Sequence, residues 1–404
     1  MKIALIAEQA GPPAPAGAGA YPGDPAAGVL TLAQGLAARQ HQVSVYARQD
    51  GAALPGRADL GPGVTIEYLP VGPPARLPAD LLLPHIPAFC RHLAERWRRS
   101  APDVVHAHDW TSGLAALGGA ADLGIPVVQT FRSLAGHAPA GHGQPAPGMT
   151  TRARLEAALA RTARAVLVGS SAGQAELIRL GVPPAAVSVV PPGVDTATFQ
   201  PFGPAAARSG RPRLLMVAPL TPPAGRAELA IAVRALADVP EAELLVVSGP
   251  ARGRLASDPG YRALTRLARQ LGVHDRLSCT ADVRQADMPA LMRSADVLLS
   301  LTTTEPFAMV ALEAMACGLA VIASGAGTSR DAVIDGVTGY LVPPGQPALL
   351  AARISQLLER PMLREGFGIA AASRAQARYS WERVSQETLA VYEALPPRRL
   401  QAAA

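Results

Sequence analysis

Strand-like and helix-like segments alternate along almost the whole chain, and this alternation restricts the fold more than any other feature. Short apolar runs typical of buried strands, such as Lys2–Ala7 and Asp103–Ala107, come before segments with apolar residues at helical spacing, such as Val29–Arg39 and Ser112–Leu123. Such a sequence buries its apolar residues in parallel sheets that helices cover on both faces. The pattern therefore predicts the α/β class.

The alternation runs in two blocks, because residues 201–212 interrupt it with proline, glycine, alanine and arginine. A chain of 404 residues is also too long for one ordinary hydrophobic core. We therefore expect two Rossmann-like, doubly wound domains, at residues 1–200 and 213–379, with a linker at 201–212. A last helix at Trp381–Leu395, within residues 380–404, is expected to pack back on the first domain.

The remaining predicted elements continue the same rhythm in both blocks. The other strands are predicted at Gln42–Tyr46, Pro126–Thr130, Ala165–Gly169, Val187–Val190, Arg213–Val217, Glu243–Ser248, Arg276–Thr280, Val297–Leu301 and Ala320–Ala323. The other helices are predicted at Ala88–Arg99, Arg152–Thr162, Ala172–Leu180, Arg226–Leu236, Tyr261–Leu271, Met288–Ser294, Pro306–Cys317 and Pro347–Glu359.

Composition argues against several classes of protein. Hydrophobic residues make up 49% of the chain and charged residues 17%, which is not the composition of a disordered protein. The net charge of +6 comes with only 6 Phe, 7 Tyr and 3 Trp, so no surface for nucleic acid is expected. Cys90, Cys279 and Cys317 are isolated, which argues against disulfides or zinc sites and suits the cytosol. The sequence shows no signal peptide and no apolar stretch long enough to cross a membrane, so we expect a soluble, cytoplasmic protein.

One segment, from Thr302 to Gly318, carries recognisable chemistry. Its sequence is TTTEPFAMVALEAMACG, in which a strand ends at Glu305 and a helix begins at Pro306. Proline fits the first turn of a helix, and the free N–H groups that follow form an anion site. A second carboxylate, Glu313, lies eight positions after the first. A phosphate site with an acidic residue on each side suits a sugar joined to a nucleoside diphosphate.

Two doubly wound domains would leave a cleft at the carboxyl ends of their strands, where ligands of open α/β sheets bind. The sequence has no G-x-G-x-x-G between a strand and a helix, no P-loop and no G-x-S-x-G elbow. A dehydrogenase is therefore disfavoured. Periodicity alone also permits two structural domains without chemistry.

Four further stretches point to a family. They read DVVHAHDWTSGLAAL from Asp103, VSVVPPGVDTATFQP from Val187, ADVLLSLTTTEPFAMVALEAMACGLAVIAS from Ala295, and DAVIDGVTGYLVPPG from Asp331. Over nearly its whole length the chain resembles the retaining glycosyltransferases of family four, which have the GT-B fold and include sucrose-phosphate-synthase-like and mycothiol-type enzymes.

The resemblance implies transfer of a sugar from a nucleoside diphosphate donor, usually a UDP-sugar, to an acceptor hydroxyl with retention. It implies no metal and no cofactor, since protein groups hold the diphosphate. Glu305 would contact the donor sugar, and Glu313 the ribose. His108 and Asp109 would lie on the acceptor side, with Trp110 nearby. The remaining donor-binding positions implied are Pro306, Phe307, Ala308, Met309, Gly23, Gly225 and Arg226.

The chain departs from the family at positions that hold the leaving diphosphate. Pro219 stands where the family has arginine, and Ala224 where it has lysine. Arg132 replaces a histidine that usually follows a Thr-Phe pair. Arg226, Arg132, Arg252 and Arg330 are candidates for a relocated cation. Two hypotheses therefore stay open: a transferase of weakened activity, or an inactive GT-B protein that binds a nucleotide sugar or partners an active paralogue.

Two other features have plainer interpretations. His106 and His108 alternate on one strand and are predicted to point the same way, but no third metal ligand is evident. The helix RHLAERWRR from Arg91 is basic, and we favour a solvated face over contact with anionic lipid. The acceptor, and whether the chain forms an oligomer with itself or with a second protein, cannot be read from the sequence.

Overall fold

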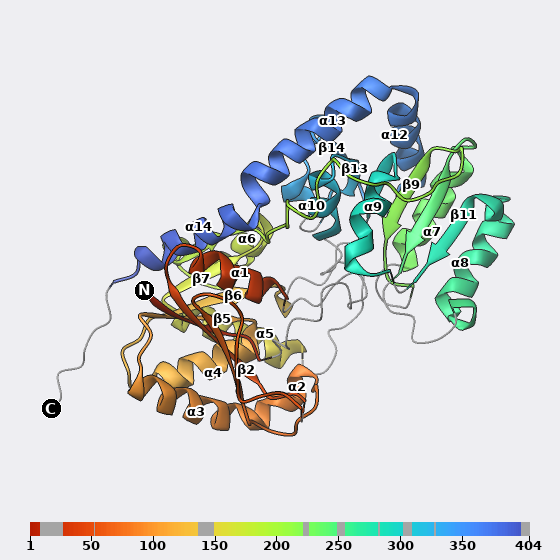
Figure 1. Cartoon of the computed structure of the whole chain (residues 1–404). Helices are drawn as coiled ribbons and strands as arrows, with labels where there is room; N and C mark the ends of the chain where they lie inside the picture. The colour runs from red at the N-terminus through yellow and green to blue at the C-terminus, as the bar shows by residue number, and fades with distance from the viewer. Residues whose placement is uncertain are drawn as a thin grey trace. The chain divides into compact units, whose positions relative to one another are not determined.

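The computed structural model describes residues 1–8, 27–51, 53–135, 149–220, 226–248, 255–281, 283–301, 309–326 and 329–396. The chain divides into two compact units, each built on its own parallel sheet (Figure 1). Of the described residues, those up to Pro192 and those from Trp381 onward form the N-terminal unit. Gly193–Ser380 form the C-terminal unit. The predicted α/β class with two doubly wound sheets is confirmed.

The N-terminal sheet has the strand order β3-β4-β2-β1-β5-β6-β7-β8, and all neighbours are parallel except β3 and β4. Its strands are β1 Lys2–Ile6, β2 Gln42–Arg48, β3 Arg57–Asp59, β4 Val64–Leu69, β5 Val104–His108, β6 Val127–Phe131, β7 Ala165–Val168 and β8 Val187–Val189. Its helices are α1 Ala27–Ala37, α2 Ala79–Leu82, α3 Ile86–Arg99, α4 Trp110–Ala120, α5 Met149–Thr162, α6 Ser171–Arg179 and α14 Trp381–Glu393.

Alternation along the strands builds a core on each face of this sheet. Ile3 and Leu5 of β1 pack in one cluster with α1 and with Tyr392 of α14. Ala4 and Ile6 of the same strand pack in the other, with α3 and α4. Helix α14, near the end of the chain, thus lies beside α1 (Figure 1). Strands β3 and β4 were missed by the sequence pattern, because they lie among glycines and prolines that read as loop.

The C-terminal sheet has the order β11-β10-β9-β12-β13-β14, and every pair is parallel. Its strands are β9 Arg213–Val217, β10 Glu243–Val247, β11 Leu277–Thr280, β12 Val297–Ser300, β13 Ala320–Ser324 and β14 Gly339–Val342. Its helices are α7 Arg226–Ala237, α8 Pro259–Gln270, α9 Met288–Arg293, α10 Met309–Ala316, α11 Ser329–Ala332, α12 Pro347–Glu359 and α13 Pro361–Arg374.

Two core clusters again lie on opposite faces of this sheet. Leu214 and Met216 of β9 pack in the cluster of α7, α8 and α12, whereas Leu215 and Val217 pack in that of α9 and α10. Helix α13 and strand β14 were not predicted. Two glycines inside α13 and a proline at its start hide its helical pattern.

Residues of the expected linker make their contacts within the C-terminal unit. The N–H of Ala206 donates to the carbonyl of Ala290 at 2.8 Å, and Arg208 pairs with Asp296 at 3.0 Å. The guanidinium of Arg213 donates to the carbonyl of Ala207 at 3.0 Å. Among the helices of the described part of the chain, none is long and apolar enough to cross a membrane.

Candidate functional site

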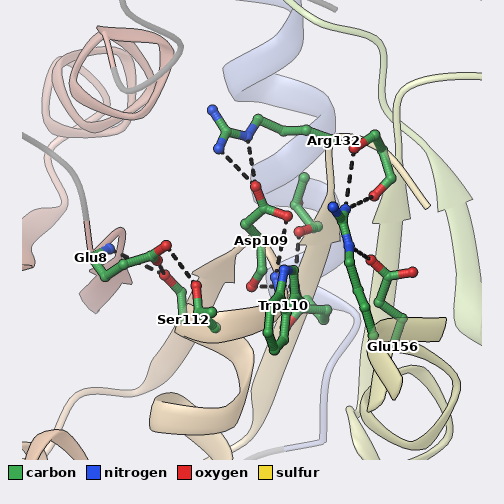
Figure 2. Close-up of polar contacts among 11 residues, drawn as sticks. Glu8, Asp109, Trp110, Ser112, Arg132 and Glu156 are labelled. Carbon is green, nitrogen blue, oxygen red and sulfur yellow. Dashed lines mark hydrogen bonds and ion pairs between the residues drawn. The ribbon is translucent and has the colours of Figure 1, made fainter. Parts of the chain in front are cut away.

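Polar side chains gather where β1, β5 and β6 of the N-terminal sheet end and where α4 and α5 begin (Figure 2). Asp109 lies at the centre of this group, directly after β5. Its φ of 74° falls in a region that residues other than glycine rarely adopt. The N–H of Asp109 donates to Thr130 O at 2.9 Å, and its carbonyl accepts from Gly113 at 3.0 Å and from Gln129 Nε2 at 3.0 Å. These bonds hold the backbone in that conformation.

The side chain of Asp109 has two further roles. Its Oδ1 accepts from the N–H of Trp110 at 3.2 Å and so caps α4. Its Oδ2 accepts from Arg132 Nη2 at 2.7 Å and from Arg132 Nε at 3.2 Å. Trp110 itself is buried, and it packs in a core cluster with Phe131. It therefore supports the site rather than facing a ligand.

Two histidines lie side by side on β5, as their alternation predicted. The ring centroids of His106 and His108 are 4.2 Å apart. His106 bonds to the hydroxyl of Tyr392 at 2.5 Å and to that of Thr130 at 2.6 Å, and burial lowers its pKa well below the usual value. Burial, with the charge of Arg132 as a second cause, lowers the pKa of His108 to about 3. Both rings are therefore neutral at pH 7.

The Nε2 atom of His108 is buried and has no hydrogen-bond partner among the described residues. Among the residues that the structure describes, no three side chains of the types that bind metals lie close together. The geometry thus offers His108 as a neutral polar group rather than as a cation.

Glu8, which comes shortly after β1, was missed as a site residue. Its buried carboxylate accepts from Thr111 Oγ1 at 2.5 Å and from the hydroxyl of Ser112. Burial raises the pKa of Glu8, and the bonds from Ser112 and Thr111 oppose this shift. The available signal was a carboxylate that ends an apolar strand, the feature that singled out Glu305.

A second ion pair borders the group on the α5 side (Figure 2). Arg152 Nε donates to Glu156 Oε1 at 2.6 Å, and its Nη2 donates to Ser133 O at 3.1 Å. The other oxygen of Glu156 accepts from the N–H of Ala135 at 2.8 Å. The sequence contains both residues one helical turn apart, but its pattern does not distinguish them from a surface pair.

In the C-terminal unit, two predicted donor-binding residues share α10. Met309 begins this helix, and Glu313 lies one turn later with 8% of its surface exposed. Pro219 follows β9 closely and is partly buried. Arg226 is the first residue of α7, and its side chain is outside the described structure. The other predicted positions lie outside the described residues: Glu305, Pro306, Phe307, Ala308, Gly23, Gly225 and Ala224.

Two family models match consecutive parts of the chain. The first, Glycosyltransferase Family 4, matches residues 26–198. The second, Glycosyl transferases group 1, matches residues 202–374. The first match covers the strands of the N-terminal sheet except β1, and the second covers all the strands of the C-terminal sheet.

Relatives and solved structures match over the full length. The D-inositol 3-phosphate glycosyltransferase of Xylanimonas cellulosilytica is 34% identical, over 92% of this chain and 91% of the relative. The structure of sucrose-phosphate synthase from Thermosynechococcus elongatus superposes with a TM-score of 0.82 at 26% identity, over 97% of this chain and 98% of the other. Anabaena HepE in complex with UDP-glucose superposes with a TM-score of 0.69 at 21% identity, over 98% and 100% of the two chains.

Three observations point to the same family. Each unit has its own parallel sheet, one glycosyltransferase family model matches each unit, and a relative above 30% identity matches nine-tenths of the chain. The chain belongs to the glycosyltransferases of family four, which have the GT-B fold.

Proposed function

We propose that the protein is a retaining hexosyltransferase that moves a sugar from a UDP-sugar to an acceptor hydroxyl. The observation that carries the proposal is the 34% identity to a glycosyltransferase across both units. A similarity confined to one unit would support only the donor side or only the acceptor side of the reaction. The complex of HepE with UDP-glucose supports the choice of donor. Three free cysteines, at positions 90, 279 and 317, suit a cytosolic place of action.

Glu313 is the described residue on which the donor side of this proposal rests. Its neighbours on α10, Val310, Ala311, Leu312 and Ala314, are all buried and apolar. A carboxylate is seldom retained in such surroundings without a specific role. We infer that it accepts hydrogen bonds from the ribose hydroxyls of the donor.

The other donor contacts in the proposal come from the segment before α10. Glu305 would bind the hydroxyls of the sugar, and backbone N–H groups from Phe307 to Met309 would bind the phosphates, with no metal taking part. Pro306 would begin the helix, and Gly23 and Gly225 would let the backbone approach the donor closely.

On the acceptor side, His108 and Asp109 would bind the hydroxyl that attacks. His108 is neutral, so its Nε2 can take part in a hydrogen bond to that hydroxyl without carrying charge. Asp109 is fixed by its backbone contacts and by Arg132. This fixed geometry suits positioning of an acceptor.

Pro219 favours a second candidate function, a protein that binds a nucleotide sugar without transferring it. Proline cannot supply the charge that arginine gives the leaving diphosphate in the family. Loss of one preorganised donor of this kind lowers turnover by roughly a hundredfold to a thousandfold. Arg226 and Arg132 are the candidates for compensation.

Binding and turnover measured together separate the two functions. The full chain is titrated with UDP-glucose and related donors by calorimetry, and transfer and hydrolysis are followed with the same donors. The proposal expects binding, transfer to a hydroxyl acceptor and a product of unchanged anomeric configuration by NMR. Binding without turnover supports the second candidate, and absence of both contradicts the two functions together.

A variant pair tests Glu313. Glu313→Gln keeps the size of the side chain and should weaken UDP-sugar binding at least about tenfold, because the amide loses one acceptor for the two ribose hydroxyls. Glu365→Gln, at an exposed position of α13, is the control. Equal donor affinity in both variants would remove Glu313 from the site.

A further inference from the structure

Positive and negative side chains lie beside one another at the carboxyl edge of the N-terminal sheet. Arginines at this edge in the described residues include Arg48, Arg76, Arg132 and Arg152. The carboxylates beside them are Glu8, Asp50, Asp109 and Glu156. This edge is where an open parallel sheet binds its ligand. The balance of charge at the edge therefore bears on what the acceptor can be.

The ion pair at this edge that includes a proposed acceptor-side residue is that of Asp109 with Arg132. Two N–H groups of the arginine share one carboxylate oxygen, and the side chains are 45% and 20% exposed for Arg132 and Asp109. The pair can therefore be reached from solvent, yet the positive charge of Arg132 is already opposed by the carboxylate.

Two further arginines at this edge are paired with carboxylates. Arg152 lies between Glu156 and Ser133, as described above. Arg76 is 3.4 Å from the carboxylate of Asp50. Arg48 is buried and donates to the carbonyls of Pro73 and Ala75 rather than to a carboxylate. Burial lowers the pKa of Arg48, and the charges of Asp50 and Glu8 oppose this shift.

We propose that the acceptor is an uncharged polyol, and that Asp109 is the residue which sets this choice. The inference rests on the proposed function and narrows its acceptor. A phosphate group is bound most strongly where cations without a carboxylate partner donate charge-assisted hydrogen bonds to its oxygens. Here a phosphate dianion would also meet the negative charge of Asp109.

A polyol has the opposite requirements. Each hydroxyl both donates and accepts, so a site needs donors and acceptors side by side and no net charge. The Asp109–Arg132 pair presents both, and neutral His108 adds a polar nitrogen. The acceptor of this chain would thus differ from the phosphorylated one in the name of the Xylanimonas relative.

Matched pairs of acceptors test the inference. The full chain is supplied with a UDP-sugar that it binds, and kcat/KM is measured for myo-inositol against inositol 3-phosphate, and for glucose against glucose 6-phosphate. The neutral member of at least one pair should be preferred by tenfold or more. A preference for the phosphorylated members overturns the proposal.

Asp109→Asn tests the residue. Asparagine still caps a helix and tolerates the left-handed region, so α4 should keep its start. Removal of the charge releases Arg132 for a phosphate, and the ratio of kcat/KM for the neutral over the phosphorylated acceptor should fall by tenfold or more. Asp122→Asn, exposed just beyond the other end of α4, is the control. An unchanged ratio in Asp109→Asn overturns the role of Asp109.

The remaining outcomes separate this inference from the proposed function. If the donor binds or is hydrolysed but no neutral polyol accelerates its consumption, the acceptor inference fails while the donor assignment stands. If no donor binds and none is consumed, both fail.

Discussion

At the scale of single residues, burial decides the charge of the histidines on β5. His106 is enclosed by Tyr392 and Thr130, and the pKa of His108 lies near 3. In the unfolded chain both rings regain the ordinary value of about 6.5. At a pH between the folded and unfolded pKa values, the unfolded chain binds protons that the folded chain does not. The free energy of unfolding therefore decreases as the pH falls below about 6.5.

We therefore predict that the contribution of these histidines to stability is flat above about pH 7.5 and that stability falls between pH 6.5 and pH 5, with each histidine contributing at most about 1.4 kcal/mol per pH unit. His108→Gln should make this fall shallower, because one titrating ring is lost. Urea unfolding at a series of pH values measures the slope. His274→Gln, at an exposed position, is the control, and an equal slope in the two variants would contradict the prediction. Glu8 acts with the opposite sign, since its pKa is raised, but it is present in both variants and so does not affect the difference between their slopes.

At the scale of elements, α13 depends on one glycine but not on another. A Cβ added to Gly368 would overlap the carbonyl of Gly318, which follows α10. A Cβ added to Gly366 has no atom within 4 Å. Both positions are helical, so both gain intrinsic helix propensity from alanine, but only one leaves room for the methyl group.

The two substitutions should therefore have opposite effects. Gly368→Ala is expected to lower the free energy of unfolding by about 1–3 kcal/mol, because the backbones of α13 and of residue 318 must separate. Gly366→Ala is expected to raise it by up to about 1 kcal/mol. Chemical denaturation of the two variants in parallel measures both values. The same sign of change in both would contradict the packing described here.

At the scale of the whole molecule, the N-terminal unit is completed by the end of the chain. Tyr392 of α14 bonds to His106 on β5, and Arg39 donates to the carbonyl of Glu382 at 3.2 Å. A Cβ on Gly35 of α1 would collide with Ser385. Helix α14 thus packs directly on α1 and on the central strands, although it follows the C-terminal unit in the sequence.

Truncation after Ser380 should therefore loosen the N-terminal unit and spare the C-terminal one. Hydrogen exchange is expected to accelerate in α1 and in β5, because their apolar faces lose the cover of α14. Rates in β9, β10 and α7 should change little. A chain ending at Pro396 is the control. Equal acceleration in both units would show that the two do not unfold separately.

Much of this architecture could be predicted from the sequence. Side-chain periods of 2 and 3.6 identify strands and helices locally, so most elements were placed to within a few residues. The same local rule put His106 and His108 on one face. Prediction failed at α13, whose two glycines weaken its helical pattern, and at β4, whose alternating buried residues directly follow the glycines and proline of residues 61–63.

The amino-acid sequence by itself determined the fold class, the two blocks and the family motifs, because each depends on residues close together along the chain. Only the tertiary structure decided the partners at the N-terminal edge. Asp109 meets Arg132 across 23 positions, Glu8 meets Ser112 across 104, and His106 meets Tyr392 across 286. The order β2-β1-β5-β6 and the return of α14 create these contacts, and the charge balance and neutral histidines follow from them. Local sequence patterns do not indicate which side chains, far apart along the chain, the strand order will bring into contact.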